Sequence, residues 1–162
     1  MAMYSVTNIN GTLQNISTAF SSVTSCPLAI QASGTRRFKV FDFTIGVVGT
    51  PNATDCSINW DFSRTTSSNG GTSLAMNPYD GSDIAATNSA YVNFSGTTVG
   101  VAAQGSGLGL WAVGLNQRNS FRWACAPGYE YISGATSATG FGLRAYSPTF
   151  ASTVSATMHI YE

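Results

Sequence analysis

TVSATMHIYE, residues 153–162, is the stretch of sequence that decides the fold class. Apolar residues stand at every second position, and polar residues fill the positions between them. Successive side chains of a β-strand point to opposite faces, so the pattern predicts a strand with one face on a core. We expect the inward residues to be Val154, Ala156, Met158 and Ile160, and the outward ones Ser155, Thr157, His159 and Tyr161.

The same alternation recurs elsewhere along the chain. In Ser57–Arg64, Ile58, Trp60 and Phe62 are expected inside, with Ser57, Asn59, Asp61 and Ser63 outside. In Ser120–Cys125 the inward set is Phe121, Trp123 and Cys125, with Cys125 as a small core residue. Further strands are expected at Trp111–Leu115 and Phe141–Tyr146, with weaker signals at Tyr91–Phe94 and Val99–Val101.

The segment Phe38–Val48 changes phase partway along. Phe38 and Val40 share one phase, and Phe41, Phe43, Ile45 and Val47 share the other. Either a β-bulge shifts the register near Val40, or both faces of this strand are covered.

Turn-rich segments separate these strands, and we find no amphipathic helix. The turns are Gly49–Thr54, Thr65–Thr72, Asn77–Ser82 and Ala126–Gly128. Short strands between such turns predict an all-β protein, an antiparallel β-sandwich with long Ser/Thr/Gly-rich loops, the jelly roll being one form of it. We assign the sandwich to residues 36–162. Residues 1–35 are either a first strand or an extended arm that reaches a neighbouring subunit.

Charge is scarce in this chain of 162 residues, where 9% are Asp, Glu, Lys or Arg, against about 25% in an average globular protein. Hydroxyl and amide groups cost less to desolvate than charges do, so such a surface favours permanent contact with other subunits. A secreted β-domain is the alternative that the same composition allows. A net charge of zero and one lysine exclude a field that would attract nucleic acid or a membrane surface. No apolar run is long enough to span a bilayer, and the N-terminus lacks the features of a signal peptide.

The inventory of reactive side chains argues against an enzyme, a metal site or a cofactor. His159 is the single histidine, and a triad or a metal site would need it to meet an acid such as Asp42 or Asp61. Three cysteines at unrelated spacings fit neither a disulfide framework nor a metal pattern: Cys26, Cys56 and Cys125.

Three further features have both a functional and a structural interpretation. Asp80 and Asp83 suit a calcium loop, but a turn in which the Asp side chains bond the backbone is favoured. Gly105–Gly109 resembles a phosphate loop, but an apolar β-like run follows it instead of a helix. Three tyrosines could stack on sugars or anchor a protein interface: Tyr129, Tyr131 and Tyr161.

The segment Gly114–Glu162 carries a resemblance to small structural proteins encoded in tailed-phage genomes, many from aquatic and cyanobacterial hosts. The shared pattern is Leu-Asn-Gln-Arg, Phe-Arg-Trp, Ala-x-Pro-Gly-x-Glu, Gly-x-Gly-Leu, Ser-Pro and a closing strand that ends in Glu. Here these elements are Leu115–Arg118, Phe121–Trp123, Ala126–Glu130, Gly140–Leu143, Ser147-Pro148 and Ala156–Glu162.

This resemblance implies a virion protein of the head decoration or cement type. Such a protein would bind the major capsid protein on the capsid exterior, after synthesis in the host cytoplasm, as a homo-oligomer (dimer or trimer). The alternative is a carbohydrate-binding adhesion module attached to the virion.

Five charged residues are the candidate interface set: Arg36, Arg37, Arg118, Arg122 and Glu130. Within the motif, we expect Arg118 and Arg122 to pair with Glu130 across a hairpin turned at Pro127-Gly128. The alternative is that both arginines fork onto carboxylates of the capsid shell.

Overall fold

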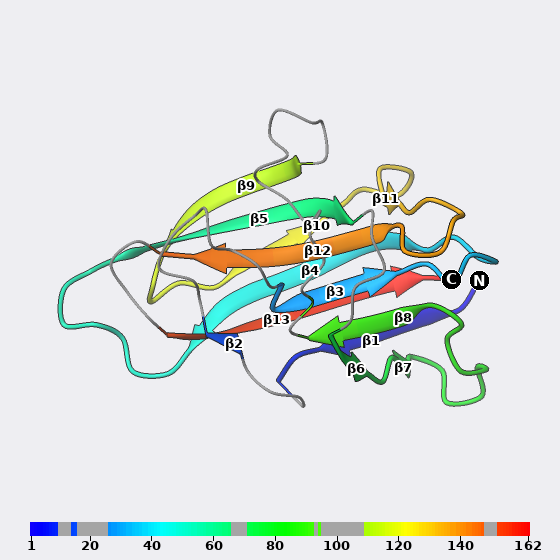
Figure 1. Ribbon diagram of the computed structural model, residues 1–162, viewed down its shortest axis with the longest axis horizontal. Coiled ribbons are helices and arrows are strands. Elements are labelled where there is room, and N and C mark those ends of the chain that lie inside the picture. Colours follow the sequence, from blue (N-terminus) through cyan, green and yellow to red (C-terminus); the bar gives the residue numbers. More distant parts are fainter. Residues whose placement is uncertain (10–13, 16–25, 66–70, 93, 95–108, 148–151) are drawn as a thin grey trace.

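The computed structural model describes residues 1–9, 14–15, 26–65, 71–92, 94, 109–147 and 152–162. They form two packed antiparallel sheets and no helix, so the predicted all-β sandwich is confirmed (Figure 1). Within these residues no helix is long and apolar enough to cross a membrane. Strand Val99–Val101 and most of Gly105–Gly109, both expected from sequence, lie outside the described residues.

Sheet A contains the chain's C-terminal strand at its centre. Its order is β10 (Phe121–Ala124), β4 (Lys39–Val48), β13 (Thr153–Tyr161), β1 (Met3–Thr7) and β7 (Asn77–Pro78), with β11 (Tyr131–Ile132) beside β4 and β2 (Gln14–Asn15) beside β13. Sheet B has the order β6 (Thr72–Leu74), β8 (Ser89–Val92), β3 (Leu28–Gln31), β12 (Gly140–Tyr146), β5 (Ser57–Thr65) and β9 (Gly109–Asn116).

Strand pairing follows the jelly-roll pattern. Early strands pair antiparallel with late ones in reverse chain order: β1 with β13, β3 with β12, β4 with β10 and β5 with β9. An antiparallel ribbon wrapped into two sheets produces this arrangement. The short strands β6, β7 and β8 lie between β5 and β9 in the chain and extend the sheets beyond β3 and β1. Both β1 and β3, from the N-terminal 35 residues, therefore pair with strands of residues 36–162.

The core lies between the sheets and follows the predicted alternation. Along β13 every second residue is buried, which confirms the four inward residues expected there. Ile58, Trp60 and Phe62 of β5 are also buried, as predicted. Phe43, from the opposite sheet, stacks on Phe62 with ring centroids 5.1 Å apart.

A β-bulge explains the phase change in β4. The register between β13 and β4 shifts between His159 and Ile160, which pair with Asp42 and Val40, so Phe41 is the extra residue. Val40 and Phe43 are both buried in the core, whereas Phe41 is half-buried. The bulge is thus one of the two predicted explanations, and Phe41 leaves the inward phase expected for it because it is the unpaired residue.

The face of sheet B that points away from the core is more buried than the alternation predicts. Asp61 and Ser63 were expected in solvent but are 3% and 1% exposed. Arg144 of β12 is buried beside them, and its Nη2 lies 2.7 Å from Asp61 Oδ2. Burial raises the pKa of the Asp61 carboxyl, while hydrogen bonds from Arg144 and Ser63 act in the opposite direction. The prediction that these two side chains lie in solvent is wrong. Alternation along a strand shows which residues share a face, but it does not show whether the face turned away from the core is covered.

The prediction that Cys125 is a small core residue is also wrong. Cys125 shares the phase of Phe121 and Trp123, but all three are half-buried, because β10 is an edge strand at the rim of the sandwich. Cys125 therefore is not a core residue, although its backbone N–H donates to the carbonyl of Phe41 at 3.0 Å.

Candidate functional site: the outer face of sheet A

The outer face of sheet A, the face turned away from the core, is the candidate site. It is formed by alternate residues of four adjacent strands, β1, β13, β4 and β10. Most of its side chains carry hydroxyl groups, because the polar positions of these strands are filled by Ser and Thr. Its members include Met3, Ser5, Thr7, Asp42, Thr44, Gly46, Arg122, Ala124, Thr153, Ser155, Thr157, His159 and Tyr161.

An arginine–carboxylate pair lies near one end of this face. Arg122 of β10 forks onto Asp42 of β4, with Nε 2.9 Å from Oδ2 and a second bond from Nη2. The Asp42 side chain is 7% exposed, whereas the Arg122 side chain is 67% exposed. The hydrogen bonds to Asp42 raise the pKa of the Arg122 guanidinium. The pair therefore presents a guanidinium surface whose charge is already balanced.

Aromatic rings surround His159 beside that pair. The Phe41 ring lies 4.3 Å from the Tyr161 ring and 6.1 Å from the imidazole, between centroids. The Tyr79 hydroxyl bonds His159 Nδ1. Burial lowers the pKa of His159 and raises that of Tyr79, which favours a neutral imidazole that accepts the hydrogen bond from the phenol. His159 thus has a structural partner that its sequence context does not reveal.

Threonines fill the middle of the face. Thr157 of β13 stands opposite Thr7 of β1 on one side and Thr44 of β4 on the other. The Thr157 hydroxyl donates to that of Thr7 at 3.0 Å. Cross-strand hydroxyl pairs of this kind stabilise a sheet without placing charge on its surface.

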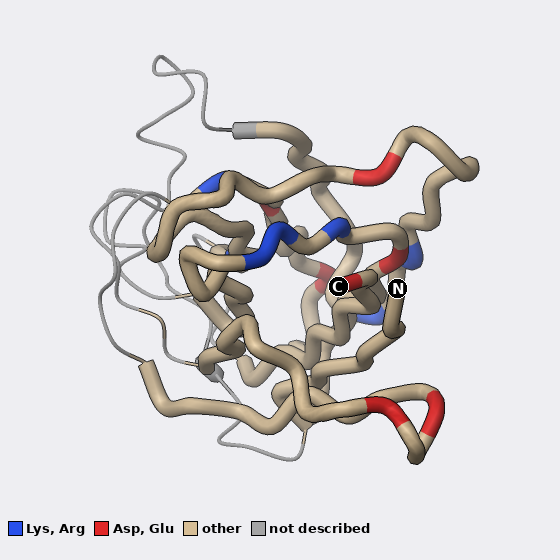
Figure 2. Tube along the Cα trace, turned by 90° about the vertical axis from the view of Figure 1, so that its right-hand side faces the viewer, with Lys and Arg blue, Asp and Glu red and all other residues tan. Residues whose placement is uncertain are grey.

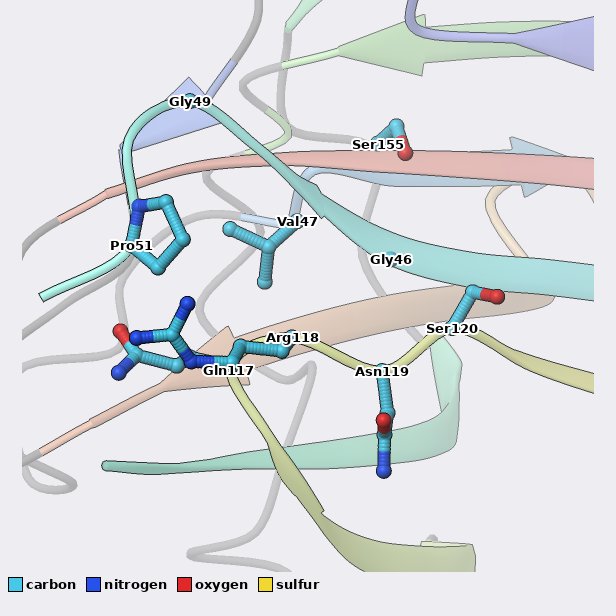
Figure 3. Close-up of a pocket in the computed structure, with 9 residues that line it drawn as sticks. All are labelled: Gly46, Val47, Gly49, Pro51, Gln117, Arg118, Asn119, Ser120 and Ser155. Atoms are coloured by element: carbon cyan, nitrogen blue, oxygen red, sulfur yellow. The ribbon is translucent and has the colours of Figure 1, made fainter. Parts of the chain in front are cut away.

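An open pocket of about 380 Å³ lies at the other end of the face. Its walls come from β4, β13, the loop after β4 and the turn before β10, with Gly46, Val47, Pro51, Arg118 and Ser155 among them. Figure 3 shows the Val47 side chain pointing into the space between Pro51 and Arg118.

The Leu-Asn-Gln-Arg motif holds the loop that forms this pocket. Gln117 is buried; its Oε1 accepts from the Asn52 N–H at 2.8 Å, and its Nε2 donates to the carbonyls of Asn52 and Thr54. Arg118 continues the clamp, with Nε 3.1 Å from Asp55 Oδ1. The motif therefore has a structural role that the sequence interpretation, a polar turn, did not identify.

The five candidate interface residues do not come together. The predicted pairing of Arg118 and Arg122 with Glu130 is wrong, because both arginines bond aspartates of neighbouring segments. Glu130 instead accepts from the Gly128 N–H at 3.0 Å, which lowers its pKa. Pro127-Gly128 does form the predicted turn, with Gly128 at a φ of 93°.

Arg36 and Arg37 lie in the exposed segment before β4. Arg36 is 3.9 Å from Glu162, near the end where the two termini lie side by side (Figure 2). The Ala2 N–H donates to the Glu162 carbonyl at 3.0 Å, so both chain ends are bonded into sheet A.

Most charge in the protein is matched internally. The seven basic and seven acidic residues of the sequence all lie in the described ranges, where they form five ion pairs. Asp80 belongs to none of these pairs and accepts from the Ser82 N–H at 2.9 Å. This confirms the backbone-bonded turn expected there. No group of three or more His, Cys, Asp or Glu residues in the described ranges is placed to hold a metal ion.

The three tyrosines considered for sugar stacking have different environments. Tyr131 is half-buried and stacks on Trp123 at 4.9 Å between centroids, inside the sandwich rim. Tyr161 is half-buried against Phe41, and Tyr129 is 78% exposed on a turn. Tyr79, which the sequence did not single out, is 54% exposed on the outer face.

Comparison with family models, curated proteins and solved structures finds no match for the chain.

Proposed function

We propose that this protein is a non-catalytic head decoration (cement) protein of a tailed phage, which docks on the major capsid protein through the outer face of sheet A. The observation that carries the proposal is the chemistry of that face, a row of hydroxyl side chains with its charge already balanced. The motif resemblance of Gly114–Glu162 supports the virion assignment.

Desolvation favours docking through this face. A charge that enters an interface without a partner loses its hydration, which costs several kcal/mol. Here Asp42 is paired with Arg122, and Arg118 at the pocket end is paired with Asp55. The threonines between them have hydroxyls that can bond a partner at little desolvation cost. The forked guanidinium of Arg122 remains at the surface, where it can contact the shell without losing Asp42.

The mechanism would be adhesive. Each copy would cover a boundary between capsid subunits, and many modest contacts would add up across the shell. Resistance to internal DNA pressure then depends on how many copies are bound rather than on any one strong contact.

The test compares capsids with and without the protein. We expect capsids that lack it to assemble but to lose their genomes on mild heating. Thr44→Glu on the outer face is expected to prevent binding to the capsid, whereas Ser73→Glu, exposed on β6 of sheet B, is the matched control and binds normally. Equal genome retention with and without the protein, or normal binding by Thr44→Glu, would refute the proposal. Cryo-electron microscopy must also show many copies on the head.

A carbohydrate-binding adhesion module is the second candidate, and one observation favours it. The exposed Tyr79 ring lies beside His159 and the Asp42–Arg122 pair, which together offer a stacking surface and polar partners. Glycan-array binding that Tyr79→Ala abolishes and Tyr129→Ala preserves would support this candidate. A few copies located at the tail would favour it over the decoration role.

A further inference from the structure

The edges of the two sheets differ in how well they are protected. An exposed edge strand presents unpaired backbone groups, and proteins usually protect it by shortness, proline, charge or cover. At the ends of the sheets, β6 has three residues, β7 has two and includes Pro78, and β10 carries Arg122. Each of these three edges is thus short, and two carry a further protective residue.

Among the described residues, strand β9 has none of these protective features. It is eight residues long, GLWAVGLN, with neither charge nor proline. Its one neighbour among the described residues is β5. The register with β5 shifts near Ser63, at the start of β9, and runs regularly from Trp111 to Asn116. This regular stretch is long enough to accept another strand.

The side chains of β9 suit such a contact on both faces. Trp111, Val113 and Leu115 pack against the core yet remain partly exposed. On the opposite face Ala112 and Gly114 are exposed and small, so no bulky side chain at these two positions keeps another backbone away. The Trp111 ring also stacks on Phe121 of β10 at 5.2 Å between centroids, so the open rim of the sandwich is apolar here.

We infer that β9 is a homodimerisation edge, at which a second copy of this chain adds its own β9 antiparallel. An uncharged antiparallel edge is complementary to itself, and a twofold axis satisfies both copies with one contact. A twofold axis that is perpendicular to the sheet and passes midway between the two Val113 residues places Trp111 opposite Leu115 of the second copy. The same axis places Ala112 opposite Gly114, so large side chains meet on one face and small ones on the other. Sheet B then continues across both subunits.

The inference is independent of the proposed capsid contact, because β9 belongs to sheet B and the docking face belongs to sheet A. A dimer formed in this way leaves both outer faces of sheet A uncovered by the pairing strands. Failure of one proposal therefore does not decide the other.

The experiment measures the mass of the purified full chain by light scattering over a wide concentration range. We expect a dimer that dissociates on dilution. Val113→Lys places two lysines opposite each other on the axis, where like charges repel, and is expected to give a folded monomer at concentrations where the parent chain is dimeric. Ser73→Lys, on the β6 edge of the same sheet, is the control and should remain dimeric.

Hydrogen exchange provides a second measurement on the unaltered chain, which decides the question if Val113→Lys fails to fold. Amides of β9 that face away from β5 should exchange more slowly at high than at low protein concentration. In the mass measurement, the inference is overturned by a parent chain that is monomeric throughout or trimeric, by a dimeric Val113→Lys variant or by a monomeric Ser73→Lys variant. In the exchange measurement, it is overturned if the exchange of the β9 amides does not depend on protein concentration.

Discussion

Gly140→Ala tests how closely β12 approaches β3. Gly140 pairs with Gln31 of β3 and Thr65 of β5, so it lies between two strands in the middle of sheet B. A Cβ at this position would lie 1.9 Å from the carbonyl oxygen of Ile30 and 2.8 Å from Gln31 Cα. Both atoms belong to the backbone, so no side-chain rotation relieves the contact.

The magnitude follows from this geometry. Since Cβ atoms essentially never approach another heavy atom within 3.0 Å, the two strands must separate locally by about 1.1 Å. Overpacking alone costs about 1–3 kcal/mol. The separation also weakens nearby backbone bonds such as that from the Ala32 N–H to the Thr139 carbonyl, now 2.8 Å long; each buried group left unpaired adds about 1–3 kcal/mol. We expect Gly140→Ala to lower the free energy of unfolding by about 3–5 kcal/mol and the Tm by about 10 °C.

The assay is denaturant unfolding followed by tryptophan fluorescence, with Gly81→Ala as the matched control. Gly81 has no heavy atom within 4 Å of a Cβ built on it and does not adopt a left-handed φ. The control is therefore expected to change stability by less than about 1 kcal/mol, in the stabilising direction. Unfolding free energies for the two variants that agree within about 1 kcal/mol would refute the close approach of β12 to β3.

Three other changes test two buried polar groups and one half-buried imidazole. Gln117→Leu removes the clamp on the loop after β4 and is expected to cost about 2 kcal/mol, with faster hydrogen exchange at the Asn52 amide; unchanged exchange there would contradict this role. Asp61→Asn removes the counter-charge of buried Arg144 and is expected to cost about 3–5 kcal/mol in denaturant unfolding; a loss below about 1 kcal/mol would show that the pair is hydrated. Burial lowers the pKa of His159 below its ordinary 6.5, so the unfolded chain binds a proton more readily and stability falls as the pH drops below about 6.5. His159→Asn should flatten that part of a curve of unfolding free energy against pH, and an unchanged slope would count against desolvation of the half-buried imidazole.

Strand positions followed from the sequence wherever one face is buried and the other is open. In β13 the alternation is correct at every residue from Val154 to Ile160, because the side-chain period of a strand is two and one face meets the core. The phase change around Val40 likewise predicted either a bulge or a strand covered on both faces, and the register with β13 shows that it is a bulge. The sequence predicted a sandwich and left the jelly roll as one possible form of it. The strand order could not be predicted, because local patterns do not identify which strands pair.

The site was less predictable because its contacts join distant parts of the chain. Arg122 and Glu130 are close in sequence, so a hairpin pair was a reasonable expectation. Yet β10 pairs with β4, and that register places Asp42, 80 residues away, within reach of Arg122. The bond from Tyr79 to His159 also spans 80 residues and leaves no local signal.

By itself, then, the sequence determined that the protein is a charge-poor all-β sandwich with alternating strands, since periodicity and composition are local properties. Only the tertiary structure decided that Asp61 is buried against Arg144, that Cys125 lies at a rim rather than in the core, and that β9 pairs with β5 alone among the described strands. The physical reason is the same in each case. Burial and pairing depend on which strand lies next to which. The folded antiparallel ribbon brings together residues that are far apart along the chain, and their distance in sequence does not predict which of them make contact.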